Sequence, residues 1–384
     1  MSPESMLSSL VAFPSIVGTP NGALVDFVRD YLAGHDVSST VIAGPEGDRY
    51  NLFATIGPAE QKGYILSGHL DVVPAGLSGW AGDPFRLRRQ DGRLIARGAV
   101  DMKGFVAAVL AAVPQLARMD LARPIHIALS YDEEAGCRGV PHLIARLSTL
   151  CAPALGCIVG EPSGLVPVLR HKGKAALRVV ARGVSGHSSR PDLGSNAIHT
   201  LLPALQAVAV EARTQGCTGP RNPHFEPPFS TLQVGKIEGG EALNIIPAFA
   251  SAEIEARAIA DVDPLDLLKP VMDEVAQSDD ISAEVIAAYP PLALDETHPL
   301  ACLMGELTGR APCPAVSYGT EAGLFQAAGV PSIVCGPGDI ARAHKPEEYI
   351  TTDELDAAYG MILRLGRHLA GKDLSARSTA ITSC

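Results

Sequence analysis

The chain has 384 residues, 47% of them hydrophobic and 19% charged, a globular composition that predicts two domains or one large one. Its formal net charge of −11 at pH 7 argues against a nucleic-acid partner, because binding a phosphate backbone needs a basic face. No apolar stretch approaches the roughly 20 residues of a membrane span, and the start MSPESMLSSL lacks a signal-peptide pattern. The eight cysteines show no CxxC spacing, which indicates reduced thiols and a cytoplasmic protein.

The first half of the chain alternates strand-like and helix-like segments. Residues 101–117 (DMKGFVAAVLAAVPQLA) predict a helix that begins with an acidic residue. The strand-like runs are 63–68, 124–130, 155–160 and 166–169. Such alternation predicts an α/β domain with a mixed, mostly parallel sheet and helices on both faces.

Between residues 173 and 288 the pattern changes. In chain order the segments predict a strand (KAALRVVAR), a helix (SNAIHTLLPALQAVAVEA), two strands (FSTLQVGKIEGG, FASAEIEARAI), a helix (DPLDLLKPVMDEVAQ) and a strand (ISAEVIAAY). This β-α-β-β-α-β order is typical of a ferredoxin-like α+β domain. The α/β pattern then resumes, with PSIVCG as a strand and 352–370 as a closing helix. We therefore expect a catalytic domain over 1–172 and 289–384, with 173–288 inserted.

Histidine and acidic residues follow the predicted strands of the α/β domain at their C-terminal ends. They are His69, Asp71, Asp101, Asp132, Glu133, Glu134, Glu161 and His344. In open α/β sheets ligands bind at this edge, so we expect these side chains to converge there. Two histidines with three or more carboxylates and no cysteine suit a zinc-like ion. The number of donors exceeds the need of one tetrahedral ion, which predicts two ions that share a carboxylate.

Asp101 opens a predicted helix and is the candidate for the shared carboxylate. Asp71 is expected to accept the second ring N–H of His69 and so to orient that ligand. Each residue alone has an ordinary structural explanation. Asp101 suits a helix cap, DEE a solvated turn and His344 an exposed surface position. The joint pattern favours the metal site.

The motifs HLDVVP, GAVDMKG, DEE, GEP and HKPEEY, in this order, resemble the M20 family of co-catalytic metallo-aminoacylases and peptidases. The resemblance covers nearly the whole chain, including the GHSS and NIIP segments of the inserted domain. It implies that His69 and Glu161 hold one zinc ion, with cobalt as an alternative, and that Glu134 and His344 hold the other. It places Asp101 between the two ions. It also implies a lid or dimerisation role for the inserted domain, and a homodimer.

The resemblance implies hydrolysis of a linear amide bond. A bound ion would lower the pKa of water from 15.7 toward about 7, and the resulting hydroxide would attack the acyl carbonyl. Glu133 would act as general base and return the proton to the leaving amine. His187, reaching a site from the small domain, in the family commonly that of the neighbouring subunit, would stabilise the oxyanion. Without the resemblance, His187 is equally well explained as a solvated turn histidine.

Four further residues are predicted to contact the substrate. Asn244 would hydrogen-bond it, Arg257 would clamp an α-carboxylate, and Gly319 and Thr320 would contact its backbone. A turn-forming asparagine and an exposed strand-end arginine are the ordinary alternatives for the first two.

Within the family, YDEEAGCRG, GEPS and the segment 318–350 most resemble the members that deacetylate N2-acetyl-L-ornithine to L-ornithine and acetate in arginine biosynthesis. The segment departs from that pattern at Arg342, where the relatives more often carry glutamine. The alternatives are a succinyl-diaminopimelate desuccinylase, another aminoacylase or a dipeptidase. A metal-free scaffold protein is a third class. A nucleotide-binding protein is a fourth, but GAVDMKG matches neither phosphate-binding glycine motif.

Overall fold

The computed structural model describes residues 1–76 and 78–370, which divide into two compact units. Unit 1 contains Met1–Arg170, Leu294–Pro314 and the part of the chain from Thr320 onward. Unit 2 contains His171–Ala293 and the short segment Ala315–Gly319, which the expected borders after residues 172 and 288 do not include. No helix of the described residues is long and apolar enough to cross a membrane.

A six-stranded sheet forms the centre of unit 1, in the order β1-β2-β6-β3-β7-β14. The strands are β1 (Ser39–Ala43), β2 (Tyr50–Ile56), β3 (Tyr64–His69), β6 (Ile125–Ser130), β7 (Gly156–Pro162) and β14 (Ser332–Gly336). Strands β6, β3, β7 and β14 run parallel, and β1 and β2 complete the sheet in antiparallel pairings. This mixed, mostly parallel sheet confirms the predicted fold class.

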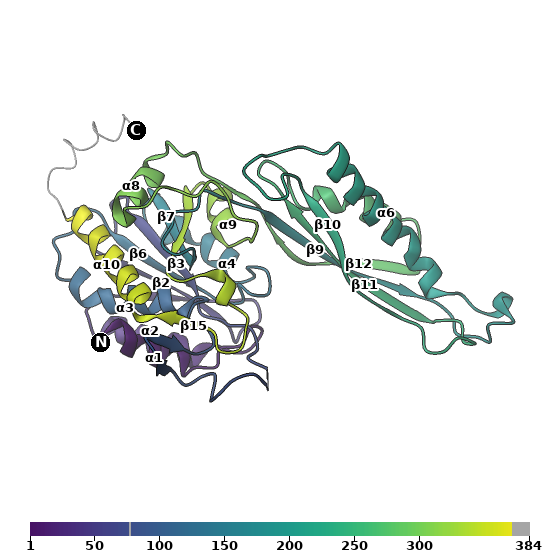
Figure 1. The fold of residues 1–384 in the computed structure, drawn as a ribbon, viewed down its shortest axis with the longest axis horizontal. Coiled ribbons are helices and arrows are strands. Elements are labelled where there is room, and N and C mark those ends of the chain that lie inside the picture. Colours follow the sequence, from purple (N-terminus) through teal and green to yellow (C-terminus); the bar gives the residue numbers. More distant parts are fainter. Residues whose placement is uncertain (77, 371–384) are drawn as a thin grey trace. The chain divides into compact units, whose positions relative to one another are not determined.

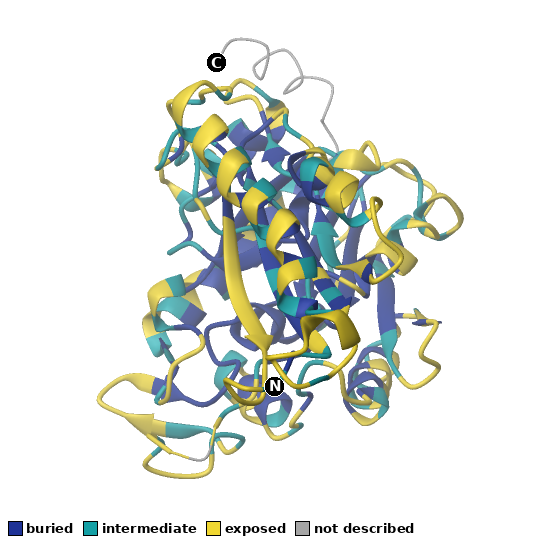
Figure 2. Ribbon diagram, turned by 90° about the vertical axis from the view of Figure 1, so that its right-hand side faces the viewer, coloured by how far each residue is buried: buried dark blue, intermediate teal, exposed yellow. Residues whose placement is uncertain are grey.

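Helices cover both faces of this sheet (Figure 1). They are α1 (Pro3–Val11), α2 (Gly22–Ala33), α3 (Lys103–Leu116), α4 (Val140–Ile144), α5 (Leu147–Leu150), α8 (Pro299–Thr308), α9 (Ala322–Ala327) and α10 (Thr352–Leu369). Helix α3 packs on β3 and β7 and is flanked by α1 and α10, whereas α4 and α9 contact each other and the sheet. Figure 2 colours buried residues dark blue and exposed residues yellow, and strands of the molecule are among its buried parts. Strands enclosed in this way are buried along nearly their whole length.

Helix α3 is buried on almost every side, which explains its nearly continuous run of apolar residues. Its first residue, Lys103, is also buried and donates its ammonium protons to the carbonyl oxygens of Leu10 (3.2 Å) and Phe13 (2.8 Å). These carbonyls lie at and just beyond the C-terminal end of α1, where helical carbonyls lack partners. Close packing against the sheet requires glycine at residue 160, because a Cβ there would collide with the ring of Phe105.

A small antiparallel sheet in the order β15-β5-β4 joins two parts of unit 1 that are distant in sequence. It contains β4 (Arg88–Gln90), β5 (Arg93–Ile95) and β15 (Tyr349–Thr351), and η3 (Ile340–Arg342) lies shortly before β15. The predicted strand over 166–169 is wrong, because these residues make only isolated bridges at Val168. The short strand that comes next is β8 (Arg170–His171), which pairs with β13 (Leu292–Ala293).

Unit 2 is an antiparallel sheet in the order β10-β11-β9-β12 with helices packed against it. Its elements are β9 (Gly173–Arg182), η1 (Pro191–Leu193), α6 (Ala197–Cys217), β10 (Thr231–Gly239), β11 (Phe249–Ala258), η2 (Asp266–Leu268), α7 (Lys269–Val275) and β12 (Ile281–Tyr289). The chain order is the predicted β-α-β-β-α-β. The second predicted helix is split into η2 and α7, with Pro270 in the first turn of α7, where a missing N–H is tolerated.

Candidate metal centre

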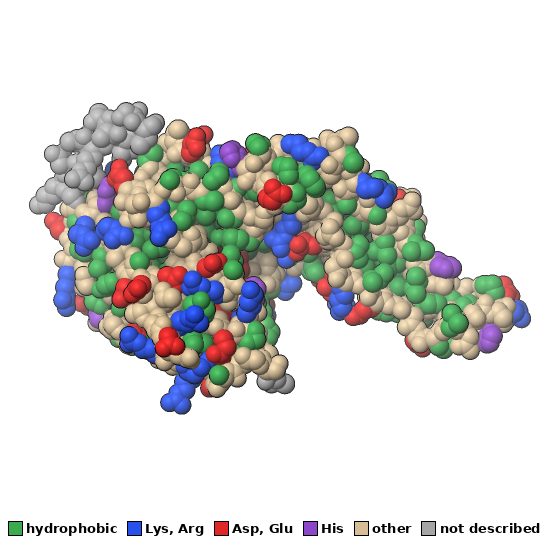
Figure 3. All heavy atoms as spheres, viewed as in Figure 1, with side chains coloured by type: hydrophobic (Ala, Val, Ile, Leu, Met, Phe, Trp, Pro, Cys, Tyr) green, Lys and Arg blue, Asp and Glu red, His purple; other side chains and the backbone are tan. Residues whose placement is uncertain are grey.

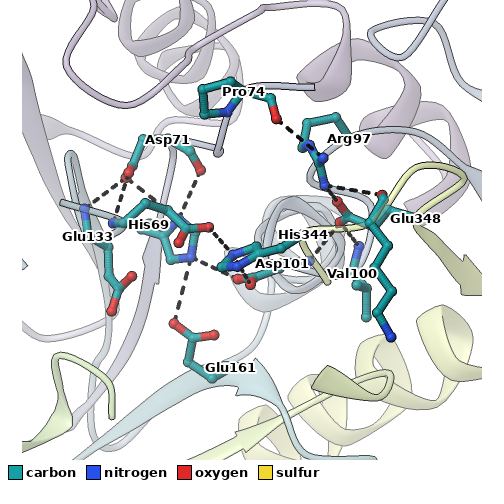
Figure 4. Close-up of polar contacts among 12 residues, drawn as sticks. His69, Asp71, Pro74, Arg97, Val100, Asp101, Glu133, Glu161, His344 and Glu348 are labelled. Carbon is teal, nitrogen blue, oxygen red and sulfur yellow. Dashed lines mark hydrogen bonds and ion pairs between the residues drawn. The ribbon is translucent and has the colours of Figure 1, made fainter. Parts of the chain in front are cut away.

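The candidate ligands of unit 1 gather at the carboxyl ends of its parallel strands (Figure 4). His69 is the last residue of β3, and Glu161 lies near the end of β7. Glu133 and Glu134 belong to the loop after β6, and His344 to the loop between η3 and β15. Asp101 lies just ahead of α3. Five segments that are far apart in sequence thus meet at the edge where the sequence predicted them.

The two carboxylate oxygens of Asp101 face two different imidazoles. Oδ1 lies 3.1 Å from Nε2 of His69, and Oδ2 lies 3.2 Å from Nε2 of His344. The same His69 nitrogen lies 3.6 Å from Oε1 of Glu161, and the same His344 nitrogen lies 2.9 Å from Oε1 of Glu134. The side chains are therefore grouped in the pairs that the family resemblance implied. Their roles as ligands stay a prediction.

The two halves of this cluster differ in exposure. His69 is 0% exposed and Glu161 4%, whereas half of the His344 side chain is exposed. The Glu133 carboxylate lies on the buried side, where its oxygen and the donor atoms of His69 and Glu161 are all within 4.8 Å of one another. Glu133 is therefore close enough to act on a molecule bound there, and close enough to be a ligand itself.

Asp71 orients His69 in a different way from the one predicted. Nδ1 of His69 lies 2.9 Å from the backbone carbonyl oxygen of Asp71 and 3.6 Å from its carboxylate. Because a carbonyl only accepts, Nδ1 carries the proton, and Nε2 of the neutral ring is free to bind a cation. The Asp71 carboxylate instead accepts the backbone N–H groups of Glu133 and Glu134, both at 3.1 Å.

The loop that carries Glu133 and Glu134 is held by buried contacts, so it is not the solvated turn that DEE alone suggests. Asp132 has a left-handed φ of 50° and is 1% exposed. Its carboxylate accepts the N–H of Gly18 at 2.7 Å and pairs with Arg49. Cys137 donates its thiol proton to Oε1 of Glu133 at 3.3 Å.

Hydrogen bonds across the cluster shift the imidazole pKa values upward. Hydrogen bonds to Asp101 and Glu134 raise the pKa of His344 to about 10. Burial acts to lower the pKa of His69, but its hydrogen bond to Asp101 and the charges of Asp71 and Glu161 raise it well above its ordinary value. Burial acts to raise the pKa of Asp101, yet hydrogen bonds from both histidines hold it well below its usual range.

The pKa values of Glu133, Asp71 and Glu161 shift upward, because burial disfavours their charged form. Burial raises the pKa of Glu133 to about 8, against the attraction of His69 and with the help of Glu134 and Asp71. Burial raises the pKa of Asp71 to about 6. Burial and the charge of Asp101 raise the pKa of Glu161 well above its ordinary value.

The donor set fits a pair of divalent cations. The crowded carboxyl groups raise the pKa of both histidines, which shows that positive charge between them is favoured. Divalent ions supply such charge, and imidazole nitrogens with carboxylate oxygens are typical ligands of zinc and similar metals. Among the described residues, two groups have potential ligand atoms that all lie within 4.8 Å of one another. They are His69 with Glu133 and Glu161, and His69 with Asp101 and Glu134.

Sequence reasoning missed two buried carboxylates beside the cluster. Glu321, 1% exposed, accepts the hydroxyl protons of Ser67 (2.5 Å) and Ser130 (2.7 Å) and so ties the ends of β3 and β6 together. Glu348, also 1% exposed, accepts the N–H of Asp101 at 3.1 Å. Both stand in segments quoted for the resemblance, but nothing in a sequence distinguishes a buried glutamate from an exposed one.

In unit 2, His187 and Asn244 lie on neighbouring exposed turns. The N–H of Ser188 donates to the carbonyl of Asn244 at 3.0 Å. Nδ1 of His187 accepts the N–H of Ser189 at 3.2 Å, so Nε2 carries the proton of the neutral ring. His187 can therefore donate one hydrogen bond to a ligand.

Arg257 lies at the other end of the same sheet. Residue 249, at the start of β11, pairs with Arg182, and Arg257 pairs with Lys174 eight residues later, a span of about 26 Å at roughly 3.3 Å per residue. The Arg257 guanidinium donates to Glu255 at 2.8 and 3.2 Å and to the hydroxyl of Tyr289 at 3.3 Å. The unit does not bring His187 and Arg257 together around one small molecule.

The last two predicted substrate contacts have structural roles in their own units. A Cβ at Gly319 would collide with the ring of Tyr289, so this close approach needs glycine. Thr320 is 0% exposed, and its hydroxyl oxygen accepts the N–H of Ala322 at the start of α9. The Thr320 hydroxyl thus accepts a backbone N–H at the start of α9, and substrate contacts of both residues stay predictions.

The sequence pattern of peptidase family M20/M25/M40 matches residues 65–368. The chain belongs to this family. The predicted M20 resemblance is confirmed, and with the candidate metal-binding groups it identifies the chain as a hydrolase of this family.

Two relatives are similar to the chain over nearly its whole length. Acetylornithine deacetylase of Vibrio vulnificus is 34% identical over 90% of this chain and 91% of its own. Acetylornithine deacetylase of Myxococcus xanthus is 33% identical over 96% and 97%.

Solved M20 structures share the fold at low identity. An M20 family metallo-carboxypeptidase from Sulfolobus solfataricus has a TM-score of 0.78 at 19% identity, covering 96% of this chain and 99% of its own. A dinuclear metal binding M20 peptidase from Bacillus subtilis has a TM-score of 0.62 at 13% identity, covering 96% and 98%.

Proposed function

We propose that this protein is a metal-dependent amidohydrolase that deacetylates N2-acetyl-L-ornithine to L-ornithine and acetate. The observation that carries the proposal is Asp101, whose two oxygens face His69 and His344 separately. A shared carboxylate between two imidazole–carboxylate pairs is the arrangement that a two-ion hydrolase needs. The substrate is inferred from the relatives named acetylornithine deacetylase, which are 33–34% identical over at least 90% of the chain.

Two divalent ions, zinc or cobalt, would be held by His69 with Glu161 and by His344 with Glu134, with Asp101 shared. When bound, such ions polarise an acyl carbonyl and make water acidic enough to lose a proton near neutral pH. The buried position of His69 and Glu161 excludes solvent on one side, and the half-exposed His344 leaves the other side open to a substrate.

Glu133 would accept the proton of the attacking water and deliver it to the leaving amine. Its carboxylate lies beside His69 and Glu161, and Cys137 and the Asp71-bound backbone hold it there. Burial raises its pKa to about 8, so the group takes up a proton readily, as delivery to an amine requires.

We infer a homodimer that associates through unit 2, in which His187 and Asn244 of one subunit serve the site of the other. Arg257 is separated from the His187 end of the sheet by the length of β11, which supports the assignment of His187 to a site in the other subunit. Figure 3 shows hydrophobic side chains gathered on the visible face of unit 2. Leu202 and Val210 of α6 and Val234 and Ile237 of β10, which is an edge strand, are exposed. Exposed apolar surface of this kind marks an association site.

We further propose that the enzyme acts in the cytoplasm, in arginine biosynthesis. Its cysteines lack the spacing of a disulfide framework or a zinc finger, and no described helix is suited to a membrane.

The test compares turnover of N2-acetyl-L-ornithine, succinyl-diaminopimelate and a dipeptide by the purified protein loaded with zinc or cobalt. We expect acetylornithine to give the highest kcat/KM and a chelator to abolish turnover reversibly. The control is Glu133→Gln purified by the same procedure, which measures contaminating activity. Preference for either other substrate would replace the assignment by a desuccinylase or a peptidase. Turnover that survives complete metal removal would contradict the metal-dependent mechanism.

A further inference from the structure

We propose that Glu348 is a positioning residue that holds the backbone of Asp101 and the His344 loop in register, so that the ion bound by His344, Glu134 and Asp101 is held tightly. The inference rests on the proposed function only in requiring that the site binds metal. It does not depend on the identity of the substrate.

The Glu348 carboxylate makes three short contacts with the segment that leads into Asp101 (Figure 4). Oε1 accepts the N–H groups of Val100 (2.9 Å) and Asp101 (3.1 Å). Oε2 accepts a proton of the Arg97 guanidinium at 2.7 Å. Glu348 is 1% exposed and Arg97 2%, so water does not compete for these groups. Glu348 therefore fixes the position of the Asp101 backbone.

Glu348 also ends the loop that carries His344. Within four residues this loop places two non-glycine residues in the left-handed region, His344 and Glu347, both at φ 60°. Such conformations persist only where surrounding contacts determine them. One buried carboxylate thus connects the segment of the shared ligand Asp101 with the loop of a ligand on a strained turn.

The two ion positions depend on Glu348 to different degrees. His69 and Glu161 belong to β3 and β7, and the central sheet holds them in place whatever happens at Glu348. His344 stands on a loop, is half exposed and lies 3.2 Å from Asp101, whose backbone N–H donates to Glu348. Loss of Glu348 should therefore weaken one ion much more than the other.

A neighbouring residue offers a matched control. Glu347 lies in the same loop, and its carboxylate pairs with Arg88 at 2.6 Å and accepts the N–H of Ala81 at 2.8 Å, both away from the Asp101 segment. Its side chain is more than a third exposed. Glu347→Gln removes the same charge from the same loop. It leaves the buried connection to Asp101 in place.

The experiment titrates metal-free protein with Zn²⁺ against a chromophoric chelator, and with Co²⁺ while the absorption spectrum of each bound ion is recorded. In Glu348→Gln we expect about a 10–100-fold loss of affinity for one ion, the usual effect of removing a group that positions a ligand. The other ion shares Asp101 but keeps His69 and Glu161 on the central sheet, so it should lose less affinity. Both ions in Glu347→Gln should stay within about twofold of wild type. In a His344→Ala background, Glu348→Gln should change the affinity of the remaining ion less than it changes the affinity of the His344 ion when His344 is present.

Because Glu348 is buried beside Arg97, the glutamine variant carries a risk of misfolding, and circular dichroism of the metal-free protein checks this. Glu348→Asp keeps the charge but is one methylene too short to reach the Arg97 guanidinium and the backbone N–H groups of Val100 and Asp101 at the same time. It should therefore weaken the same ion. Equal weakening of both ions, or unchanged affinity in Glu348→Gln and Glu348→Asp, would overturn the inference. A wild type that binds two ions but ignores acetylornithine would refute only the proposed substrate.

Discussion

Unit 1 and unit 2 present their candidate functional side chains in opposite ways. In unit 1, His69, Asp101 and Glu161 are buried at the ends of sheet strands or a helix, and each faces at least one partner of the cluster. In unit 2, His187 and Asn244 stand exposed on turns. A buried, fully partnered cluster is organised before any ligand arrives, whereas an exposed turn gains its partners only when something binds to it.

The architecture of the units explains this difference. The parallel strands of unit 1 are covered on both faces, so polar groups at their ends are enclosed and must satisfy one another. Unit 2 is an antiparallel sheet, and its edge strand β10 is exposed along most of its length. The comparison suggests that unit 1 contributes chemistry and that unit 2 contributes contacts to a partner or a substrate.

The largest expected effect comes from Glu133, the proposed general base in unit 1. Glu133→Gln keeps the size of the side chain and removes its ability to take up a proton. We expect turnover to fall by about 10²–10⁴-fold, the usual contribution of general acid–base help. Steady-state kinetics measures the loss, and elemental analysis should show unchanged metal content. A variant that loses metal as well would make Glu133 a ligand, which its position beside His69 and Glu161 also permits.

The second prediction asks whether the exposed residue of unit 2 serves a site at all. His187→Ala should lower kcat by about 10²–10³-fold, as the loss of an oxyanion donor does. Metal content and unfolding temperature should not change, because the side chain is exposed and its hydrogen bonds go to Ser189. Lost turnover with unchanged metal content would show that His187 of unit 2 acts in turnover, whereas metal binding depends on unit 1.

Mixing the two inactive variants tests which subunit His187 serves. If it acts in the partner's site, hybrid dimers of Glu133→Gln and His187→Ala contain one site with both intact residues. About a quarter of all sites should then recover activity in a random mixture. Activity that never rises above that of the separate variants would place His187 in the site of its own chain, or exclude it from catalysis.

The site of unit 1 was more predictable than that of unit 2, and the reason is topological. His69, Glu133, Glu161 and His344 stand at or after the ends of buried strands, and parallel strands deliver the residues at their carboxyl ends to one edge. Strand ends are visible in a sequence, so convergence could be inferred without knowing distances. No such rule exists for turns of an antiparallel sheet, so the roughly 26 Å between Arg257 and the His187 end of β11 was not foreseen.

Other features could not be predicted because they depend on packing. The sequence predicted that the Asp71 carboxylate accepts the ring N–H of His69, but the backbone carbonyl of Asp71 accepts it. The two groups of one residue compete for the same proton, and the sequence does not show which is nearer. Glu321 and Glu348 are positioned by contacts over 191 or more residues of sequence. The strand expected over 166–169 failed because an apolar run predicts burial, and these residues are buried without joining a ladder.

Buried histidines offer a third prediction, because each unit contains one outside the candidate site. Burial lowers the pKa of His126 in unit 1 and of His171 in unit 2 from 6.5 to about 4. The unfolded chain therefore takes up these protons at a higher pH than the folded chain. Stability should be lost as the pH falls from about 6.5 to 4, by up to about 3 kcal/mol for each histidine.

Glutamine variants measure this loss. His126→Gln keeps a polar partner for Thr55, whose hydroxyl lies 2.9 Å from Nδ1 of His126, and it cannot titrate. Denaturant unfolding between pH 7.5 and 4 should show a smaller loss of stability in His126→Gln and in His171→Gln than in wild type. An acid sensitivity that persists unchanged in both variants would show that these two histidines do not cause it.

The smallest expected effect concerns Arg342. This residue belongs to unit 1 but is only partly buried, so its ion pair should contribute little to stability. Arg342 departs from the family pattern two residues before His344. Its guanidinium turns to α10, where it donates to Glu354 at 2.8 and 3.0 Å and covers the ring of Tyr349 at 4.6 Å. Arg342 and Glu354 are both about a quarter exposed, and such pairs contribute about 1 kcal/mol or less.

Arg342→Gln should therefore lower the free energy of unfolding by about 1 kcal/mol or less and leave KM for acetylornithine within about twofold of wild type. Thr351 and Glu354 still form the capping box of α10. The Thr351 N–H donates to the Glu354 carboxylate and the Glu354 N–H donates to the Thr351 hydroxyl, and neither bond involves Arg342. Denaturant unfolding and steady-state kinetics measure the two quantities. A large rise in KM would mean that this arginine leaves Glu354 to contact the substrate, and the departure from the family pattern would then be a change of specificity.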